Sequence, residues 1–532
     1  MEKKKNDFIA QGSILAVASI LVRVMGMIYR IPMTAIIGDK GNGFYSYAYS
    51  VYTILLLLSS YSLPLAVSKM VSAKAQLGQW RNVKRVFICA IAFAIGIGTT
   101  FGLIVLIGAQ FFTRVFFHSE LAAIALRFMA PTILIMALLG VFRGFFQGLQ
   151  NTLPTAVSQI VEGLINAIMS VVFAYFLFDF GHGMDAASGT TDLGYAWGAG
   201  LIFCFILFVA YRKILAVNIS RDKTGTQQEY GDIFRLMLSI ALPVILSTAL
   251  YNLIELVDGS LFNNIMASKG MEDVKDSMWG AYNAKALLLV HIPVSISSAM
   301  AVSLVPTLTA AYALGDEQTA KSKVHAILRF ISILAFPSAV GLLVLANPII
   351  KTLFSGDTSA ASTYLQVVCP AVITFSFSTI TNSILQGIDR MNLPVCHSLI
   401  AMAVHVVVLL ILCLGFNMGI YGVIISYVIY ALVITILNFY SIGKILEYRP
   451  DVITLFVKPA AASGIMGIVC FGCYQLLNQF LGKAIPMLIS VVVAVIVYFA
   501  VAVKCKLLTE NVMKDLPKGR SLIRIAKKCR LM

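Results

Sequence analysis

Two arginines stand in a stretch of the chain that is otherwise apolar. Arg23 and Arg30 are seven residues apart, so a helix would carry both on nearly the same face, about 10 Å apart along its axis. Gly26 between them would let a bulky group approach, and Pro32 should bend the helix beyond them. Because a guanidinium is a planar, permanently charged donor fork, the pair predicts a binding site for a pyrophosphate group.

Other roles remain open for these arginines. Either could form a structural ion pair with an acid on another helix, and Arg30 could extend outward to lipid headgroups. Two acids are candidates for such a pair, since Glu255 and Asp258 lie three residues apart on one helix face. The acids themselves predict one of two things: a site for a coupling cation, Na⁺ or H⁺, or counter-ions that neutralise the arginines.

Three further ionisable residues stand in apolar segments. Glu162 has Asn166 one turn later, which fits a structural hydrogen bond as well as a functional acid. His397 and His405 lie roughly on one helix face, but no acid or cysteine accompanies them at ligand spacing. We therefore expect no metal site there.

The composition indicates that these charges lie in a membrane. Of 532 residues, 59% are hydrophobic and 12% charged, with a mean hydropathy of +0.89. Soluble domains carry about 25% charged residues. The balance excludes a soluble enzyme, a nucleic-acid-binding domain and a disulfide-stapled secreted fold. The net charge of +16 then reflects basic cytoplasmic loops rather than nucleic-acid binding.

The apolar runs predict an all-α polytopic membrane protein. A span needs about 20 apolar residues, so the supply fits roughly fourteen transmembrane helices. Helices are the expected spanning elements because a bilayer offers no water to backbone groups. We expect them at about 8–37, 43–72, 84–110, 121–146, 153–178, 193–214, 232–265, 279–312, 323–349, 360–386, 394–415, 419–446, 453–478 and 484–503.

Loop charges predict the orientation. With the N-terminus in the cytoplasm, roughly 30 basic residues fall on the inner side and about 7 on the outer side. The predicted outer loop 179–192 contains acids and no Lys or Arg. The first 22 residues resemble a signal peptide without a cleavage site, so we expect an uncleaved first helix. Both termini are therefore expected in the cytoplasm.

Three short motifs recur at a common offset. Residues 147–154 (QGLQNTLP) return as 386–394 (QGIDRMNLP), and residues 62–68 (SLPLAVS) are echoed by 297–303 (SSAMAVS). A weaker echo relates Gly43 to Gly280. An offset of six helices is even, so the copies share one orientation and form parallel repeats. Two such bundles can rock about a central site, which is a transporter layout.

The repeat predicts four parts. These are an N-terminal lobe of six helices (1–222), a C-terminal lobe of six helices (223–450), an extra helix pair (451–504) and a basic cytoplasmic tail (505–532). The tail could form a basic amphipathic helix on the anionic inner leaflet, or be disordered.

The chain resembles a known family at residues 23–32 (RVMGMIYRIP), 36–45 (IIGDKGNGFY) and 63–69 (LPLAVSK). It is similar to the polysaccharide-transporter branch of the MOP superfamily, in particular to the group of stage V sporulation protein B and the MurJ-type lipid II flippases of Gram-positive bacteria. The resemblance implies fourteen helices and export of an undecaprenyl-pyrophosphate-linked glycan across the plasma membrane, with no cofactor beyond a coupling ion.

The resemblance also implies roles for particular residues. MurJ-type flippases have a similar arginine–glycine–arginine pattern in the first helix, which supports Arg23, Gly26 and Arg30 as substrate-binding residues. Lys285 resembles a basic residue of the eighth helix, although it could also extend to lipid headgroups. Relatives that couple transport through the seventh helix favour Glu255 and Asp258 as the ion-coupling pair.

Three rival functions remain. A multidrug–cation antiporter of the same superfamily would need an apolar or acidic cavity, and a flippase for another polysaccharide repeat unit would have the same arginines. A membrane enzyme would need nucleotide or metal motifs in a large cytoplasmic loop, and no P-loop, HExxH or DxD motif is present. We therefore expect no enzymatic activity.

Overall fold

The structure is a computed structural model of the chain. It describes residues 2–61, 63–177, 184–222, 224–225, 227–313, 315–355, 358–480, 482, 484–510, 523–524 and 526–527. Within the helices some side chains also lie outside the described part, and that of Arg23 is one of them.

The chain divides into two compact units, Met1–Gly280 and Ala281–Met532. Every regular element in the described ranges is helical, with the π-helical segments labelled η. The first unit contains α1 (Glu2–Leu56), η1 (Leu57–Tyr61), α2 (Leu63–Gln76), α3 (Trp80–Phe117), α4 (Ala122–Gly148), α5 (Leu153–Leu177), α6 (Met184–Ser220), α7 (Tyr230–Ser268) and α8 (Glu272–Gly280). The second unit contains η3 (Ala281–Leu287), α9 (Leu288–Ala313), α10 (Glu317–Val344), α11 (Ala346–Leu353), α12 (Thr358–Val368), α13 (Pro370–Gly387), α14 (Asn392–Leu410), η4 (Ile411–Gly415), α15 (Ile420–Leu446), η5 (Ile453–Val457), α16 (Lys458–Asn478) and α17 (Ala484–Lys504).

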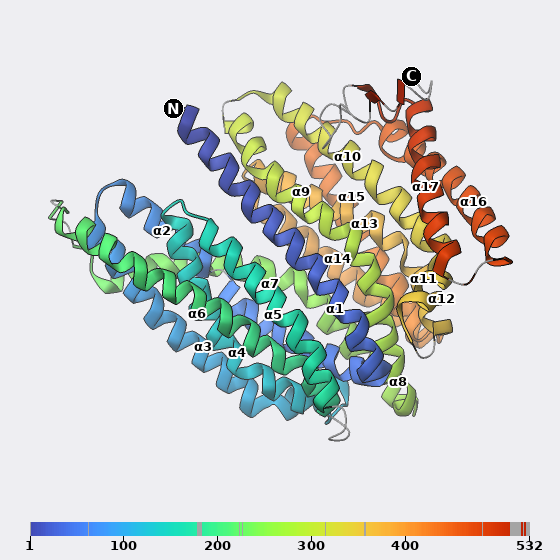
Figure 1. Ribbon diagram of the computed structural model, residues 1–532, viewed down its shortest axis with the longest axis horizontal. Helices are drawn as coiled ribbons and strands as arrows, with labels where there is room; N and C mark the ends of the chain where they lie inside the picture. The colour runs from blue at the N-terminus through green and yellow to red at the C-terminus, as the bar shows by residue number, and fades with distance from the viewer. Residues whose placement is uncertain are drawn as a thin grey trace. The chain divides into compact units, whose positions relative to one another are not determined.

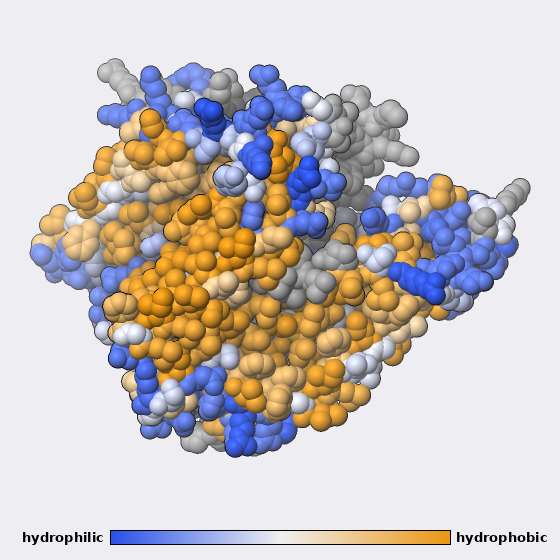
Figure 2. All heavy atoms as spheres, turned by 180° about the vertical axis from the view of Figure 1, so that it is seen from behind, coloured by the Kyte–Doolittle hydropathy of each residue, from blue (hydrophilic) through white to orange (hydrophobic). Residues whose placement is uncertain are grey.

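These helices confirm the all-α membrane fold. Among the described residues, eleven helices are long and apolar enough to cross a membrane, or twelve if the bent pair α12 and α13 forms one span. Figure 2 shows hydrophobic side chains over most of one face, with hydrophilic side chains gathered toward its margins. Each predicted range coincides with a helical stretch, while the number of fourteen spans stays a prediction.

Two expected local features differ in the structure. The predicted outer loop 179–192 is shorter, because α6 already begins at Met184. The backbone of α1 leaves the helical conformation at Gly38, with φ 69° and ψ 179°, and not at Pro32. Only glycine adopts these angles without strain, so Gly38 is the point at which the predicted first and second helices separate.

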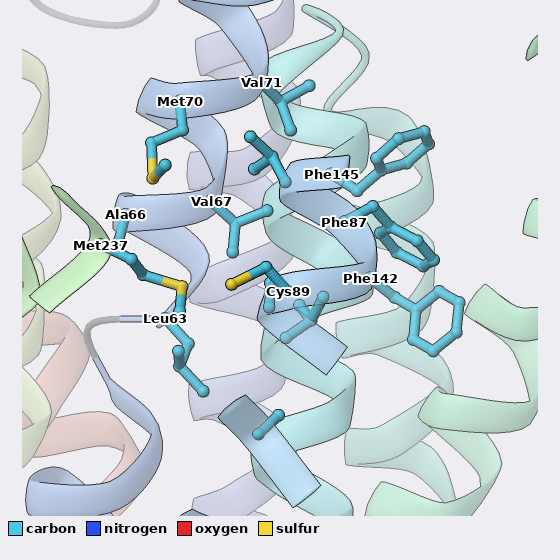
Figure 3. Close-up of a cluster of buried hydrophobic side chains, with 14 of the residues drawn as sticks. Leu63, Ala66, Val67, Met70, Val71, Phe87, Cys89, Phe142, Phe145 and Met237 are labelled. Carbon is cyan, nitrogen blue, oxygen red and sulfur yellow. The ribbon is translucent and has the colours of Figure 1, made fainter. Parts of the chain in front are cut away.

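The first unit is built around closely packed helices. Helices α3, α4 and α6 lie side by side, and α2 packs on α4 (Figure 1). Their shared core is an apolar cluster of side chains from α2, α3, α4, α6 and α7. Figure 3 shows part of it. Members labelled there include Leu63, Ala66, Val67, Met70 and Val71 of α2, Phe87 and Cys89 of α3, Phe142 and Phe145 of α4, and Met237 of α7.

The recurring motifs occupy equivalent positions in the two units. In the first, a Cβ on Gly148 of α4 would stand 2.8 Å from the Ser68 carbonyl oxygen of α2. In the second, a Cβ on Gly387 of α13 would stand 3.1 Å from the Leu308 side chain of α9. Small residues let membrane helices approach closely, and each repeat uses its glycine for the same helix pairing.

The described part of the C-terminal tail packs against protein. Ile523 and Ala526 are 8% and 0% exposed and belong to an apolar cluster with side chains of α16 and α17. The Nζ atom of Lys527 lies 3.2 Å from the Glu510 carboxylate. Most of the tail lies outside the described residues, so both expectations for it, a helix on the membrane surface and a disordered segment, stay predictions.

Candidate functional site

The predicted site residues fall in both units. Arg23, Gly26 and Arg30 lie on α1 before the break at Gly38, and the side chain of Arg23 lies outside the described residues. A Cβ on Gly26 would have no described atom within 4 Å. There is therefore room beside this glycine, as the predicted approach of a bulky group requires.

Arg30 lies among tyrosines. It is half-buried, and its guanidinium donates a hydrogen bond to the hydroxyl of Tyr29. The rings of Tyr45 and Tyr49, which follow the break in α1, are close enough to interact with the charge. The break thus folds the second half of α1 back beside the first, which brings the tyrosines to the arginine.

The structure brings Arg30 and Glu255 together. The half-buried carboxylate of Glu255, on α7, interacts electrostatically with the guanidinium of Arg30 and with the carboxylate of Asp258. Asp258 is 3% exposed. Both predicted roles of the two acids, counter-ion to Arg30 and cation binding, fit this arrangement.

An aromatic row continues from this site. The rings of Tyr45 and Tyr49 stack with centroids 5.7 Å apart, and Tyr49 meets Tyr52 at 6.1 Å. Tyr52 in turn stacks on Trp197 of α6 at 5.9 Å. The contact with Trp197 could not be predicted, because nothing in the sequence pairs residues of α1 with α6.

Lys285 lies in the second unit, on η3. It is 1% exposed, and its Nζ donates a hydrogen bond of 3.2 Å to the backbone oxygen of Ser355. This buried position excludes the alternative in which the side chain extends to lipid headgroups. An ammonium within a helical unit that spans a membrane is retained at a high desolvation cost, which keeps Lys285 a candidate for substrate binding.

Glu162 has a structural partner. Its carboxylate accepts a hydrogen bond of 2.7 Å from Arg143 of α4, whose Nε donates to the hydroxyl of Ser158 at 2.9 Å. Arg143, near the end of the predicted helix 121–146, is 7% exposed and is therefore a buried helix-packing group rather than a loop charge. The pair ties α4 to α5.

A buried ammonium group in the first unit was missed by the sequence analysis. The Nζ of Lys275 lies 2.9 Å from Asp276 Oδ1 and 3.1 Å from the Phe117 backbone oxygen. The hydroxyl of Tyr47 lies 2.8 Å from Asn263 Oδ1 and 3.1 Å from Asp276 Oδ1. Residues 272–276 look like a solvated loop by charge, and only the echo between Gly43 and Gly280 signals that α8 packs on α1.

His397 belongs to a polar network in the second unit. Its Nδ1 lies 2.7 Å from Asn438 Oδ1, and its Nε2 lies 3.2 Å from the Ser441 hydroxyl. The amide nitrogen of Asn438 donates to Thr381 and Asn382 at 2.9 and 2.8 Å. These bonds join α13, α14 and α15 and give the histidine a packing role.

Two family models match the sequence. The model described as "Polysaccharide biosynthesis protein" covers residues 8–311, and the model described as "MatE" covers residues 243–411. The first match includes the arginines of α1, the acids of α7 and Lys285. The second begins within α7 and extends across the second unit as far as η4.

Curated relatives cover most or all of the chain. The chain is 22% identical over 532 residues to "Stage V sporulation protein B" of Bacillus subtilis (strain 168). The alignment covers 98% of this chain and 100% of the relative. The chain is 26% identical over 412 residues to "Lipid II flippase MurJ" of the same organism. The alignment covers 74% of this chain and 75% of the relative.

A solved structure has the same fold. "Lipid II flippase MurJ, inward closed conformation" aligns with a TM-score of 0.67 at 15% sequence identity, over 92% of this chain and 97% of that chain. The expected all-helical transporter fold is thereby confirmed. Since one family model covers more than half of the sequence, the chain belongs to the polysaccharide biosynthesis protein family of multi-pass membrane proteins.

Proposed function

We propose that the chain is a flippase that moves an undecaprenyl-pyrophosphate-linked glycan, most simply lipid II, across the bacterial plasma membrane. The transported glycan would serve peptidoglycan or other cell-wall synthesis, in growth or in sporulation. The relatives named as lipid II flippase and as sporulation protein support this proposal. The chain itself would carry out transport and no enzymatic step.

The observation that carries the proposal is the position of Arg30. A permanently charged guanidinium is held half-buried in a helical unit, among tyrosine rings and beside Glu255. Such a charge is costly within a bilayer and is retained where it binds something. Arg30, with Arg23 two helical turns earlier and Gly26 open between them, would bind the pyrophosphate. Lys285, in the second unit, is proposed separately as a substrate-binding residue.

The proposed orientation follows from the loop charges. Both termini would lie in the cytoplasm, where basic residues contact the anionic inner leaflet. The substrate would enter from the inner leaflet and leave toward the outer one as the two repeats rock about the site. Glu255 and Asp258 would bind Na⁺ or H⁺ and so couple the change of state to an ion gradient.

A second candidate function is a cation-coupled multidrug antiporter. The match of the MatE model over residues 243–411, which include both acids of α7, favours this alternative. An antiporter for cationic drugs would use those acids and would gain nothing from Arg30. Removal of Arg30 therefore separates the two functions.

Equilibrium binding of an undecaprenyl-pyrophosphate-linked sugar to the purified protein tests the proposal. We expect Arg23→Ala and Arg30→Ala each to weaken binding by about ten- to a hundredfold, because each removes charge-assisted hydrogen bonds. Arg127→Ala removes the same charge from an exposed position on α4 and is the matched control. Equal affinity in Arg30→Ala and Arg127→Ala would contradict the proposed site, and selective binding of organic cations would favour the antiporter.

A further inference from the structure

The aromatic row, Tyr45, Tyr49, Tyr52 and Trp197, has one member that is less buried than the others. Tyr45, Tyr52 and Trp197 are 7%, 1% and 8% exposed, whereas Tyr49 is only half-buried. The ring of Tyr49 lies between those of Tyr45 and Tyr52, 5.7 and 6.1 Å away. Tyr49 is therefore the partly exposed member of the row, and the other three side chains are buried.

The rings behind Tyr49 are held in place. The hydroxyl of Tyr52 lies 2.9 Å from Thr132 Oγ1 of α4, and the ring stacks on Trp197 with an interplanar angle of 22°. An aromatic belt at a membrane interface would have its hydroxyls in headgroups. Here the hydroxyl of Tyr52 is bonded inside the unit, so the row is not such a belt.

The row also adjoins the charged site. Tyr49 lies within electrostatic range of both Arg30 and Glu255. A half-buried aromatic ring thus shares this part of the unit with a guanidinium and a carboxylate. A pyranose has an apolar face of C–H groups that packs on aromatic rings and hydroxyls that bond to charged groups, so this combination suits a sugar.

We infer that Tyr49 is a stacking platform for the sugar residue attached to the lipid pyrophosphate, with Tyr45 and Tyr52 as its fixed support. The inference rests on the proposed function, because Arg30 must hold the pyrophosphate for the adjoining sugar to reach Tyr49. It adds a specificity element: the site distinguishes a lipid pyrophosphate with a sugar from one without.

Two probes test this inference on the purified full-length protein. One is undecaprenyl pyrophosphate, and the other is the same lipid bearing a disaccharide. We expect the parent protein to bind the sugar-bearing probe about tenfold more tightly, the scale of one stacking contact. Tyr49→Ala should bring that affinity down to the sugar-free level and leave binding of the sugar-free probe unchanged, whereas Tyr49→Phe should behave as the parent.

The controls separate this inference from the proposed function. Arg30→Ala should weaken both probes by the same factor, and Tyr175→Ala, which removes a tyrosine that is 70% exposed, should change neither. If the parent binds both probes equally, or if Tyr49→Ala weakens both together, the stacking role is refuted while the pyrophosphate site stands. If the parent binds neither probe, both proposals are refuted. A thermal unfolding curve for each variant shows whether Tyr49→Ala is folded.

Discussion

Gly43 and Gly280 lie against each other's backbone where α1 crosses α8. A Cβ on Gly280 would stand 2.8 Å from the Gly43 nitrogen and would collide with the Asp39 oxygen, and a Cβ on Gly43 would collide with the Asp276 oxygen. The two glycines are also the pair related by the internal repeat. The crossing therefore joins corresponding points of the two repeats by main-chain contact.

A methyl group at this crossing should be poorly tolerated. We expect Gly280→Ala to destabilise the protein by about 1–3 kcal/mol, the usual cost of overpacking, because its neighbour is backbone and cannot rotate away. Thermal unfolding in detergent measures the effect. Gly198→Ala is the control, since a Cβ there would have no described atom within 4 Å, and equal melting temperatures for the two variants would contradict close packing at the crossing.

The buried pair of Lys275 and Asp276 should show strong coupling. Lys275→Met leaves the Asp276 carboxylate, 7% exposed, without its cation, which typically costs about 3–5 kcal/mol. Adding Asp276→Asn removes the orphaned charge, so the double variant should be more stable than Lys275→Met alone. Thermal unfolding of the two single variants and the double variant gives the coupling energy, and simple additivity would show that the pair does not interact.

The two roles of the α7 acids predict different outcomes for amide variants. If Glu255 and Asp258 bind the coupling ion, Glu255→Gln and Asp258→Asn should keep substrate affinity and lose the response of transport to Na⁺, H⁺ or voltage gradients. If the acids are counter-ions, the variants should unfold at lower temperature because Arg30 loses a neighbouring charge. Transport assays in proteoliposomes with imposed gradients distinguish the two roles. If both variants respond to every gradient as the parent does, α7 does not couple transport to an ion.

Gly26 gives a test of the approach to the arginines. Because a Cβ there has open space in the described structure, Gly26→Ala should leave stability within about 0.5–1 kcal/mol of the parent or raise it, as alanine favours a helix. If the pyrophosphate lies over this glycine, Gly26→Leu should weaken binding about tenfold while the protein stays folded. Unchanged affinity in Gly26→Leu would place the ligand elsewhere.

The linker between α6 and α7 should detach in acid. Asp222 accepts hydrogen bonds from the Arg81 and Thr224 amides and the Thr224 hydroxyl, which lowers its pKa from 3.8 to about 2. The lowered pKa means that the contribution to stability is complete above pH 3.8 and is lost as the pH falls through about 2. The protection factor of the Arg81 amide against hydrogen exchange should fall over that range, and Asp222→Asn should show a lower protection factor at neutral pH. Identical exchange in parent and variant would contradict the role of Asp222.

Much of the fold could be predicted from the sequence, because hydropathy is a local signal. Apolar runs located the helical stretches, whereas the break between the first two lies at Gly38 and not at Pro32, where a bend was expected. Contacts between distant helices have no such signal. The approach of Glu255 to Arg30 and the ring of Trp197 behind Tyr52 depend on how the helices pack.

Burial of charge was the hardest feature to predict. Arg143 has the sequence context of a loop residue, yet its partner Glu162 on α5 allows it to be buried. Lys275 stands in a charged segment, and only its tertiary neighbours make it an interior residue. The sequence around a charged residue does not show whether its side chain is solvated or buried in an ion pair, because the partner can lie on another helix.

The ammonium of Lys275 is surrounded by groups that could otherwise coordinate a free cation: a carboxylate, a main-chain oxygen and the face of the Tyr47 ring. Because this cation is covalently tethered to α8, it cannot exchange with the solution, and its occupancy does not depend on the ionic composition on either side of the membrane. The junction of α1, α3, α7 and α8 is thus closed by an ion that the polypeptide itself supplies. Any separation of α8 from this junction would carry that ion away with it.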